Sequence, residues 1–420
     1  MGKKKILFMS YGFYPWRMPA ARKWTNVTRE WIKRGHEVYV ISAWMAGSKE
    51  YEEWNGIKIF RAKNIFENIR AGISNGVFAP GAQSKKRSIG IIKMIYKKIL
   101  RLIWPDVSVF WAIYSMGILR KIMERHSFDY CVSMSLPFTS HLLGFWAKRK
   151  DEKMKWIADI QDPFYLQNPD PPNLKLFGPL NAFLEKFILR NVDYVTVTNH
   201  EIEKLYSINF KIKKISTVSH LVSDEIRYVK KNKKAKGFVF VGTLHPVVRN
   251  PSFALKTIKR YLEKVKNEEF HFYGNLSSCL SEFNKYEHFL NRNIFLHDYV
   301  PEGQLMELYS KYRYLMNIGN VSKYQLPSKI IDYMASGMPI IHFSRIENDP
   351  CARILDRCGY ALEIKACGDI QENITKMIEF VKNIKGPSKE QVKKIMKKYE
   401  TKNITDLFDA AFEAIGEKER

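Results

Sequence analysis

The chain has 420 residues, which is enough for two domains of ordinary size. Its 45% hydrophobic and 14% aromatic content excludes a disordered protein, and no apolar run approaches the roughly 20 residues that cross a bilayer. The formal net charge of +26 favours a polyanionic partner, such as nucleic acid, anionic lipid or a phosphorylated substrate. A lysine-rich surface that is merely solvated is an alternative of similar weight.

The N-terminal lysines and the run ILFM are read as the first strand and not as a signal peptide, because no cleavage site follows them. In chain order, β-rich runs occupy 5–10, 37–43, 56–62, 129–135, 155–162, 194–199 and 213–219. Helical patterns lie between them, for example at 22–34, where Gly35 ends the helix. A second series of runs occupies 237–243, 269–275, 294–300, 314–319, 339–343 and 360–364.

Short β-rich runs that alternate with helices predict an α/β protein with doubly wound parallel sheets. We expect a first Rossmann-like domain over 1–220, a lysine-rich linker over 221–236 and a second Rossmann-like domain over 237–400, with a cleft between the domains. Residues 401–420 form an amphipathic helix that we expect to pack back on the first domain.

The stretch KYQLPSKIIDYMASGMPII (323–341) predicts a helix from Pro327 that ends at Gly337. Its first turn, with Ser328 and Lys329, directs unpaired N–H groups at a ligand and favours an anion. Asp332 lies on the same side, where it could accept hydrogen bonds from hydroxyls next to a phosphate. The alternative is a surface ion pair between Lys329 and Asp332, worth about 1 kcal/mol at most.

A second basic element is the loop LHPVVRNP after the strand that ends in Gly242 and Thr243. Gly242 permits close backbone approach, and Arg249 can bind two phosphate oxygens at once. The alternative role for Arg249 is to cap a neighbouring helix.

Together these motifs resemble GT-B glycosyltransferases of the family 4 kind that builds bacterial surface polysaccharides. QLPSKIIDYMASGMPII resembles the family's Pro-Ser-Lys-x-x-Glu-Tyr signature, and VGTLHPVVRNPSFALKTI resembles its phosphate-binding segment. KILFMSYGFYPWRMPAARKW, RGHEVYVISA, FDYCVSMSLPFTSH and WIADIQDPF match the expected order of the first domain, so the resemblance covers almost the whole chain.

The resemblance implies that Arg249 and Lys329 neutralise the donor diphosphate, that Asp332 binds the donor ribose, and that Gly12 belongs to a mobile loop over the reaction centre. Two features depart from the family pattern. Tyr324 stands where the family has its first glutamate, and Ser133 and Ser135 replace a His-x-His, which leaves His141 as the nearest imidazole.

No Asp-x-Asp occurs, so we expect no metal and no other cofactor besides the nucleotide-sugar donor substrate. The resemblance implies retention of the anomeric configuration. Asp162 and His141 are candidates for orienting an acceptor hydroxyl. For Asp162, which precedes Pro163, an Asx turn is an equal alternative, and His141 is more often a core or helix-surface histidine.

Residues 85–104 combine lysines and arginines with apolar side chains at helical spacing, which is typical of a helix that lies on an anionic membrane. An ordinary helix with solvated lysines is the alternative. A polyprenyl-diphosphate-linked acceptor would explain the membrane preference. The five cysteines show no metal-binding spacing, which favours reduced thiols in the cytoplasm.

We therefore expect a glycosyltransferase at the inner face of the cell membrane that transfers a sugar from a nucleotide diphosphate to a glycan or lipid-linked saccharide during surface polysaccharide synthesis. A catalytically silent nucleotide-sugar-binding scaffold is one alternative, because Tyr324 replaces a glutamate. A nucleic-acid-binding protein is another, although we find no reading module in the sequence and expect no nucleic-acid partner.

Overall fold

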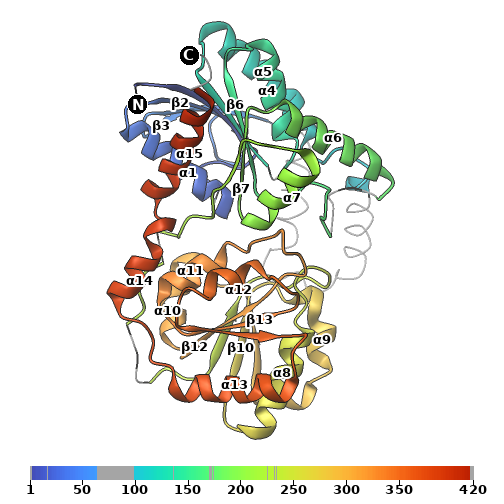
Figure 1. Ribbon diagram of the computed structural model, residues 1–420, viewed down its shortest axis with the longest axis vertical. Helices are drawn as coiled ribbons and strands as arrows, with labels where there is room; N and C mark the ends of the chain where they lie inside the picture. Colours follow the sequence, from blue (N-terminus) through green and yellow to red (C-terminus); the bar gives the residue numbers. More distant parts are fainter. Residues whose placement is uncertain are drawn as a thin grey trace. The chain divides into compact units, whose positions relative to one another are not determined.

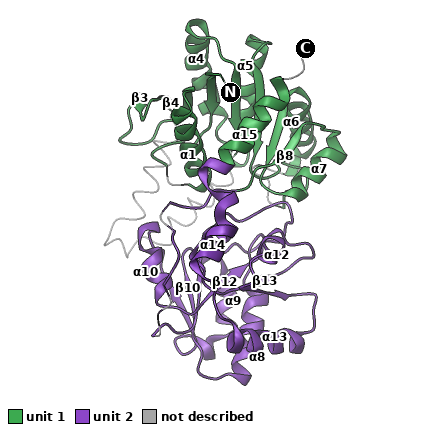
Figure 2. Cartoon of the chain, turned by 60° about the vertical axis from the view of Figure 1, so that its left-hand side comes forward, with its two compact units in different colours: residues 1–219, 404–420 green, residues 220–403 purple. Residues whose placement is uncertain are grey.

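The computed structural model of the protein describes residues 2–16, 18–63, 99–135, 137–169, 173, 175–224, 226–230, 232 and 234–416. The chain forms two compact units (Figure 2). Unit 1 contains residues 1–219 and 404–420, and unit 2 contains residues 220–403. The segment expected as a linker, 221–236, therefore lies within unit 2, where the Val229 N–H donates to the Ser336 carbonyl at 2.8 Å.

Unit 1 is built on an eight-stranded sheet in the order β3-β4-β2-β1-β5-β6-β7-β8. All neighbouring strands are parallel except the antiparallel pair β3 and β4. The strands are β1 (Lys5–Met9), β2 (Glu37–Ala43), β3 (Tyr51–Trp54), β4 (Ile57–Ala62), β5 (Tyr130–Met134), β6 (Lys155–Ile160), β7 (Tyr194–Val197) and β8 (Ile215–Thr217).

The helices of unit 1 pack on this sheet (Figure 1). Besides the C-terminal helix described below, those within the described residues are α1 (Pro19–Lys33), α4 (Val109–Arg125), α5 (Ser140–Lys150), α6 (Gly178–Asn191), α7 (His200–Phe210) and the short 3-10 helix η1 (Lys175–Phe177). Central strands such as β1 and β5 are mostly apolar because both of their faces are covered. The edge strand β3, with sequence YEEW, is partly exposed and too polar for the sequence to have indicated it.

Unit 2 is built on a six-stranded parallel sheet in the order β11-β10-β9-β12-β13-β14. The strands are β9 (Phe238–Val241), β10 (Phe270–Tyr273), β11 (Ile294–His297), β12 (Tyr314–Ile318), β13 (Ile340–Ser344) and β14 (Ala361–Lys365). The helices are α8 (Ser252–Lys264), α9 (Leu280–Asn284), α10 (Leu305–Ser310), α11 (Lys329–Ser336), α12 (Pro350–Leu355), α13 (Ile370–Asn383) and α14 (Lys389–Met396), with 3-10 turns η2 (Ser277–Cys279), η3 (Glu287–Phe289), η4 (Glu302–Gln304) and η5 (Lys397–Tyr399).

The core of unit 2 lies on both faces of its sheet. One buried cluster joins the sheet to α10, α11, α12 and α14, and the other joins it to α8, α9 and α13. The predicted α/β architecture with two doubly wound parallel sheets is confirmed.

The first residue of helix α11 differs from the predicted one, whereas the helix ends at the predicted Gly337. It begins at Lys329, two residues after the predicted Pro327. The carbonyls of Pro327 and Ser328 accept hydrogen bonds from the N–H groups of residues 330 and 331 at 3.2 and 3.1 Å, so a tighter turn with three-residue spacing precedes the helix. Gly337 ends the helix in the left-handed conformation, with a φ of 69°.

The C-terminal helix α15 (Thr401–Gly416) contributes residues from Ile404 onward to unit 1. Its Phe408 ring lies 4.6 Å from the Trp24 ring of α1, and its Phe412 ring lies 4.1 Å from the Tyr130 ring of β5. These aromatic contacts tie the end of the chain to unit 1.

Among the described residues, the structure contains no helix with the length and apolar character needed to cross a bilayer. Most of the basic segment predicted over 85–104, namely residues 85–98, lies outside the described residues.

Candidate functional site

The strand order of unit 2 reverses direction between the neighbouring strands β9 and β12. From β9 the chain continues outward through β10 and β11, and from β12 it continues the other way through β13 and β14. In open parallel sheets, ligands bind beyond the carboxyl ends of the strands at such a switch point. Arg249 follows β9 and Lys329 follows β12, so the two predicted cationic side chains lie on the two loops that flank this point.

The loops after β9 and β12 are joined directly at the switch point. The Val321 N–H donates to the Val248 carbonyl at 2.9 Å, and the Arg249 Nε donates to the Asn320 Oδ1 at 3.0 Å. Two backbone hydrogen bonds between His245 and Arg249, both 3.0 Å, close the β9 loop into a narrow turn. Arg249 is partly buried, and this burial lowers the pKa of its guanidinium. An oriented, partly desolvated guanidinium can bind an anion strongly.

The N-terminus of α11 carries the other predicted donor-binding residues. Ser328 occupies the N-cap, where its side chain makes no capping hydrogen bond, and Lys329 is the first helical residue. Both are partly buried, as is Tyr324, whose ring lies 5.3 Å from the ammonium group of Lys323. The Tyr333 hydroxyl fixes α11 against β9, since it accepts from the Val241 N–H at 2.9 Å.

Asp332 is only 5% exposed, and the structure shows a backbone partner that the sequence did not suggest. Its Oδ1 accepts a hydrogen bond from the Ser223 N–H at 2.9 Å. The Ser223 hydroxyl in turn donates to Glu302 Oε1 at 2.7 Å. Asp332 is thus buried, whereas the predicted alternative of an ion pair with Lys329 assumed a surface position.

Gly242 and Thr243 follow β9 directly. The sequence suggested that the backbone is closely approached at Gly242, but in the structure the closest approach is at Gly274. A Cβ on Gly242 would meet the Phe240 ring at 3.1 Å, whereas a Cβ on Gly274 would lie 2.1 Å from the Gly242 carbonyl oxygen. Gly274, with a φ of 122°, is therefore the residue that must lack a side chain here. Thr243 is exposed.

A buried polar cluster in unit 2 was not predicted from the sequence. The Asn317 amide nitrogen lies 2.9 Å from His342 Nδ1, and His342 Nε2 lies 3.2 Å from Asp349 Oδ2. Asp349 caps α12 through the Cys351 N–H. The histidine inside the apolar run PIIHF was the available signal, because a buried strand rarely holds an imidazole without polar partners.

Unit 1 has its own switch point, between β1 and β5. Gly12 follows β1 and Asp162 follows β6. His141 is the second residue of α5, the helix that follows β5. All three residues therefore lie at the carboxyl edge of the sheet. Gly12 is buried, and its carbonyl accepts a hydrogen bond from the Ser10 hydroxyl at 2.8 Å.

His141 is a fully buried, neutral histidine. Its Nδ1 lies 2.8 Å from the Ser133 hydroxyl, which also accepts from Trp156 Nε1 at 2.8 Å. The Ser133 hydroxyl can donate its proton to Nδ1 while it accepts from tryptophan, and in that arrangement the imidazole proton is on Nε2. Burial lowers the pKa of His141 to about 3. Nε2 has no hydrogen-bond partner among the described residues, so His141 can donate a hydrogen bond but is a poor base.

Asp162 is half-buried, and burial raises the pKa of its carboxyl to about 7. The Phe164 N–H, which an Asx turn at Asp162 would use, donates instead to Glu185 Oε1 at 2.8 Å, so the predicted alternative of an Asx turn is not formed. A carboxyl that titrates near neutral pH can exchange a proton with a hydroxyl group. Of the two predicted candidates, Asp162 therefore has the better chemistry for this task.

Asp106 is a further buried acid of unit 1 that the sequence reading did not single out. It accepts hydrogen bonds from the Ser108 N–H at 2.9 Å and from the Thr139 N–H at 3.2 Å. Burial raises the pKa of its carboxyl. Asp106 thus ties the start of α4 to the loop that leads into α5 and positions the segment that carries His141.

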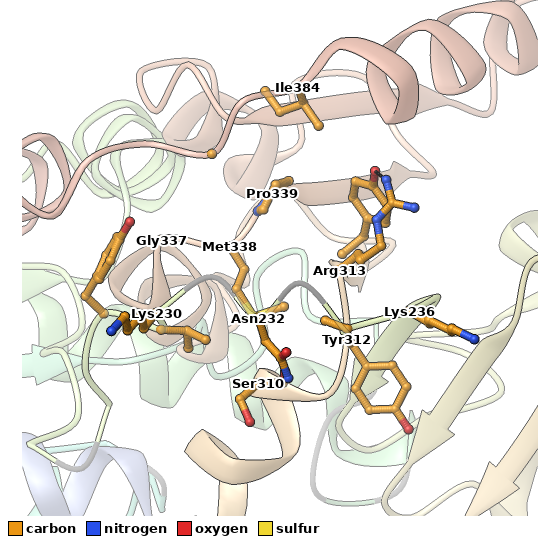
Figure 3. Close-up of a pocket in the computed structure, with 15 residues that line it drawn as sticks. Lys230, Asn232, Lys236, Ser310, Tyr312, Arg313, Gly337, Met338, Pro339 and Ile384 are labelled. Atoms are coloured by element: carbon orange, nitrogen blue, oxygen red, sulfur yellow. Dashed lines mark hydrogen bonds between the residues drawn. The ribbon is translucent and has the colours of Figure 1, made fainter.

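A cavity of about 550 Å³ in unit 2 lies away from these residues (Figure 3). Its lining includes Lys230, Lys236, Tyr312, Arg313, Met338 and Pro339. It opens at the amino ends of β12 and β13, opposite to the edge where ligands of parallel sheets bind. None of the predicted site residues lines it, and we do not assign the donor to it.

A comparison with known protein families finds a match, which covers most of unit 2. The family described as "Glycosyl transferases group 1" matches residues 235–382, which include Arg249, Lys329 and Asp332. No curated protein sequence matches the chain.

Solved structures of similar fold cover nearly the whole chain. A glycosyltransferase from Rickettsia africae is 10% identical, with a TM-score of 0.63 and 100% of both chains covered. The catalytic domain of starch synthase IV from Arabidopsis thaliana, bound to ADP and acarbose, is 9% identical, with a TM-score of 0.63 and 99% of both chains covered. A lipopolysaccharide outer core galactosyltransferase in its apo form is 12% identical, with a TM-score of 0.60 and coverage of 98% of this chain and 99% of that one.

At these identities the structures establish the fold, and the family match applies to residues 235–382. The predicted GT-B fold is confirmed by full-length similarity to glycosyltransferase structures. Residues 235–382 thus match the group 1 glycosyltransferase family, and the chain as a whole has the GT-B fold.

Proposed function

We propose that the enzyme transfers a sugar from a nucleotide-diphosphate-sugar donor to a glycan or lipid-linked saccharide acceptor of a cell-surface polysaccharide, with retention of configuration and without a metal. The observation that carries the proposal is the pairing of Arg249 with Asn320 at the switch point of unit 2, next to the N-terminus of α11. The ADP bound to the structurally similar starch synthase supports a nucleotide donor.

In this mechanism, Arg249, Lys329 and the first N–H groups of α11 stabilise the negative charge that develops on the leaving diphosphate. Gly242, Thr243 and Ser328 lie beside the diphosphate. The Asp332 carboxylate accepts a hydrogen bond from a ribose hydroxyl in addition to the one from the Ser223 N–H. A carboxylate can accept both because it has about four acceptor positions. Tyr324 faces the donor sugar in place of a glutamate.

On the acceptor side, Gly12 lies in the loop after β1, His141 donates a hydrogen bond through Nε2, and Asp162 orients the acceptor hydroxyl. The similar fold of a lipopolysaccharide galactosyltransferase supports an acceptor of the surface-polysaccharide class. We place the enzyme at the cytoplasmic face of the cell membrane, since all five cysteines are free thiols, as in a reducing compartment.

Thermal shifts in a panel of nucleotide diphosphates and nucleotide sugars test the donor site. A ligand at one hundred times its dissociation constant should stabilise the native state by about 2.7 kcal/mol. Arg249→Ala and Lys329→Ala should each weaken binding by about tenfold or more, because each removes a charge-assisted contact. The matched controls Arg260→Ala and Lys376→Ala alter solvent-exposed ion pairs of α8 and α13 and should leave the shift unchanged.

The result also separates the alternatives. Donor binding without turnover of any acceptor would support the silent scaffold, which Tyr324 keeps open. If no nucleotide shifts the melting temperature of the wild type, or if the control variants lose the shift as strongly as Arg249→Ala, the proposed donor site is wrong.

A further inference from the structure

Helix α6 of unit 1 exposes a row of large apolar side chains. Leu180 and Phe183 are 48% and 65% exposed, and Leu176 in the preceding turn is 80% exposed. Positions 180, 183 and 187 of α6 are spaced three and four residues apart, so they lie along one side of the helix, and Leu176 lies in the 3-10 turn η1 before it. The partly buried Phe187 extends the row, since its ring stacks on that of Phe183 at 6.0 Å.

The segment 99–104, which is hydrogen-bonded to α6, carries two more exposed apolar side chains. Ile99 is 52% exposed and Leu102 is 56% exposed. The segment is attached to α6 because Trp104 Nε1 donates to Asn181 Oδ1 at 3.0 Å, and Arg101 Nη2 donates to the Asn173 carbonyl at 3.1 Å. We call the set Ile99, Leu102, Leu176, Leu180 and Phe183 the α6 face.

The α6 face is not the core side of the helix. The opposite side buries Leu184, Ile188 and Leu189 against unit 1. Glu185 on that side accepts hydrogen bonds from the N–H groups of residues 164 and 166, both at 2.8 Å, and from the Tyr206 hydroxyl at 2.7 Å. The helix therefore has a fixed orientation, and Figures 1 and 2 show it along the outside of the unit. Contiguous exposed apolar patches on folded proteins mark interaction sites.

Among the described residues of η1 and α6, the exposed charged side chains are all positive. Lys175, Lys186 and Arg190 are exposed, and the one acidic residue of α6, Glu185, is buried on the other side. This pattern fits an anionic surface. It disfavours a symmetric dimer, because a two-fold axis through the face would bring identical basic rims together.

We propose that the α6 face docks on an anionic lipid bilayer. Its apolar side chains enter the boundary between headgroups and acyl chains, while Lys175, Lys186 and Arg190 lie against the lipid phosphates. The inference deepens the proposed function, because it supplies the contact through which a membrane-held acceptor is reached. It stands on residues of α6 and 99–104 that belong to the described part of the chain.

Co-sedimentation of the full chain with phosphatidylcholine vesicles, with and without phosphatidylglycerol, tests the proposal. Wild type should bind the anionic vesicles and lose binding as salt rises. Phe183→Glu should weaken vesicle binding by about tenfold or more, because it replaces an inserted ring with a charge. The control Ile208→Glu changes a residue of α7 that is 75% exposed and should bind as wild type does.

The contribution of the basic side chains is tested in the same assay with a second pair of variants, one on α6 and one on α7. Lys186→Glu should weaken binding by about fivefold or more, since each adsorbed cation contributes about that factor. Lys204→Glu, on the exposed surface of α7, should have a smaller effect. Equal losses in Lys186→Glu and Lys204→Glu, or unchanged binding of Phe183→Glu, would overturn the docking surface.

Two further measurements distinguish membrane docking from a failure of the donor site and from a dimer interface. The nucleotide-induced thermal shift of Phe183→Glu should equal that of wild type, so a failed donor site and a failed docking surface give different results. Light scattering without lipid should show the same mass for both proteins. A wild-type dimer that Phe183→Glu dissociates, with no vesicle binding by either, would assign the face to a second copy of the chain.

Discussion

At the scale of single residues, the ionisation of Asp162 has a consequence for stability. Burial raises the pKa of its carboxyl to about 7 in the folded protein, whereas an unfolded aspartate has a pKa of about 3.9. The folded state therefore binds the carboxyl proton more tightly than the unfolded state does. The resulting contribution of Asp162 to the free energy of unfolding is at its maximum below about pH 4. That contribution is lost as the pH rises to about 7.

We predict that Asp162→Asn removes this pH dependence. Against wild type, the variant should gain about 1–2 kcal/mol at pH 8, a value reduced for the partial exposure of the carboxyl, and nothing at pH 4. All nine tryptophans lie at or before residue 156, so tryptophan fluorescence during urea unfolding reports unit 1. A difference between the proteins that stays constant from pH 4 to pH 8 would show that Asp162 is not the titrating group.

The residues of the candidate site illustrate what a single sequence can predict. The positions of Gly12, His141, Asp162 and Arg249 beyond strand ends followed from the order of strands and the rule for parallel sheets. The complete burial of His141 and its hydrogen bond to Ser133 did not follow, because they depend on which residues of β5 and β6 face α5. Asp106 and the His342–Asp349 pair depend on similar contacts between distant residues.

At the scale of elements, the C-terminus of α11 combines a special backbone conformation with tight packing. Gly337 has a φ of 69°, and a Cβ there would lie 2.7 Å from the Tyr228 ring and 3.1 Å from a Val392 methyl group. The Tyr228 ring is held in place because its hydroxyl donates to the Pro387 carbonyl at 2.9 Å. Alanine at this position thus meets both strain and overlap.

We predict that Gly337→Ala destabilises unit 2 by about 3 kcal/mol, of which roughly 1 kcal/mol is backbone strain and the rest overlap with the ring. Gly359 is the matched control, since its φ is 72° and nothing lies within 4 Å of its Cβ position. Gly359→Ala should cost only the strain, about 1 kcal/mol. Scanning calorimetry measures both variants, and equal losses would contradict the role of Tyr228.

Elements were predictable where the sequence pattern was long and apolar. Every predicted β-rich run overlaps a strand, because buried parallel strands are near-continuous apolar runs. The edge strand β3 was missed because four partly exposed residues with two adjacent glutamates resemble a loop. The start of α11 was placed two residues early because proline suits both the first position of a helix and the turn before it.

At the scale of the whole molecule, the chain passes from unit 1 to unit 2 and ends in unit 1. Helix α15 supplies Phe408, Phe412 and Ile415 to the core of unit 1, and all three are at most 3% exposed. Asp409 accepts a hydrogen bond from Trp31 Nε1 at 2.8 Å on the same helix face. Unit 1 is therefore assembled from residues that are distant in sequence, such as Trp31 and Asp409, which are 378 positions apart, and the local sequence pattern does not specify such contacts.

We predict that Phe412→Ala lowers the unfolding free energy of unit 1 by about 3–5 kcal/mol, because it empties a ring-sized volume against Trp31 and Tyr130. Leu407→Ala, in the same helix but 43% exposed, should change it by less than about 0.5 kcal/mol. Urea unfolding followed by tryptophan fluorescence measures the difference. The ring of Phe412 lies 5.3 Å from that of Trp31, so the fluorescence reports on this contact. If the urea midpoint of Phe412→Ala equals that of wild type, α15 contributes little to the stability of unit 1.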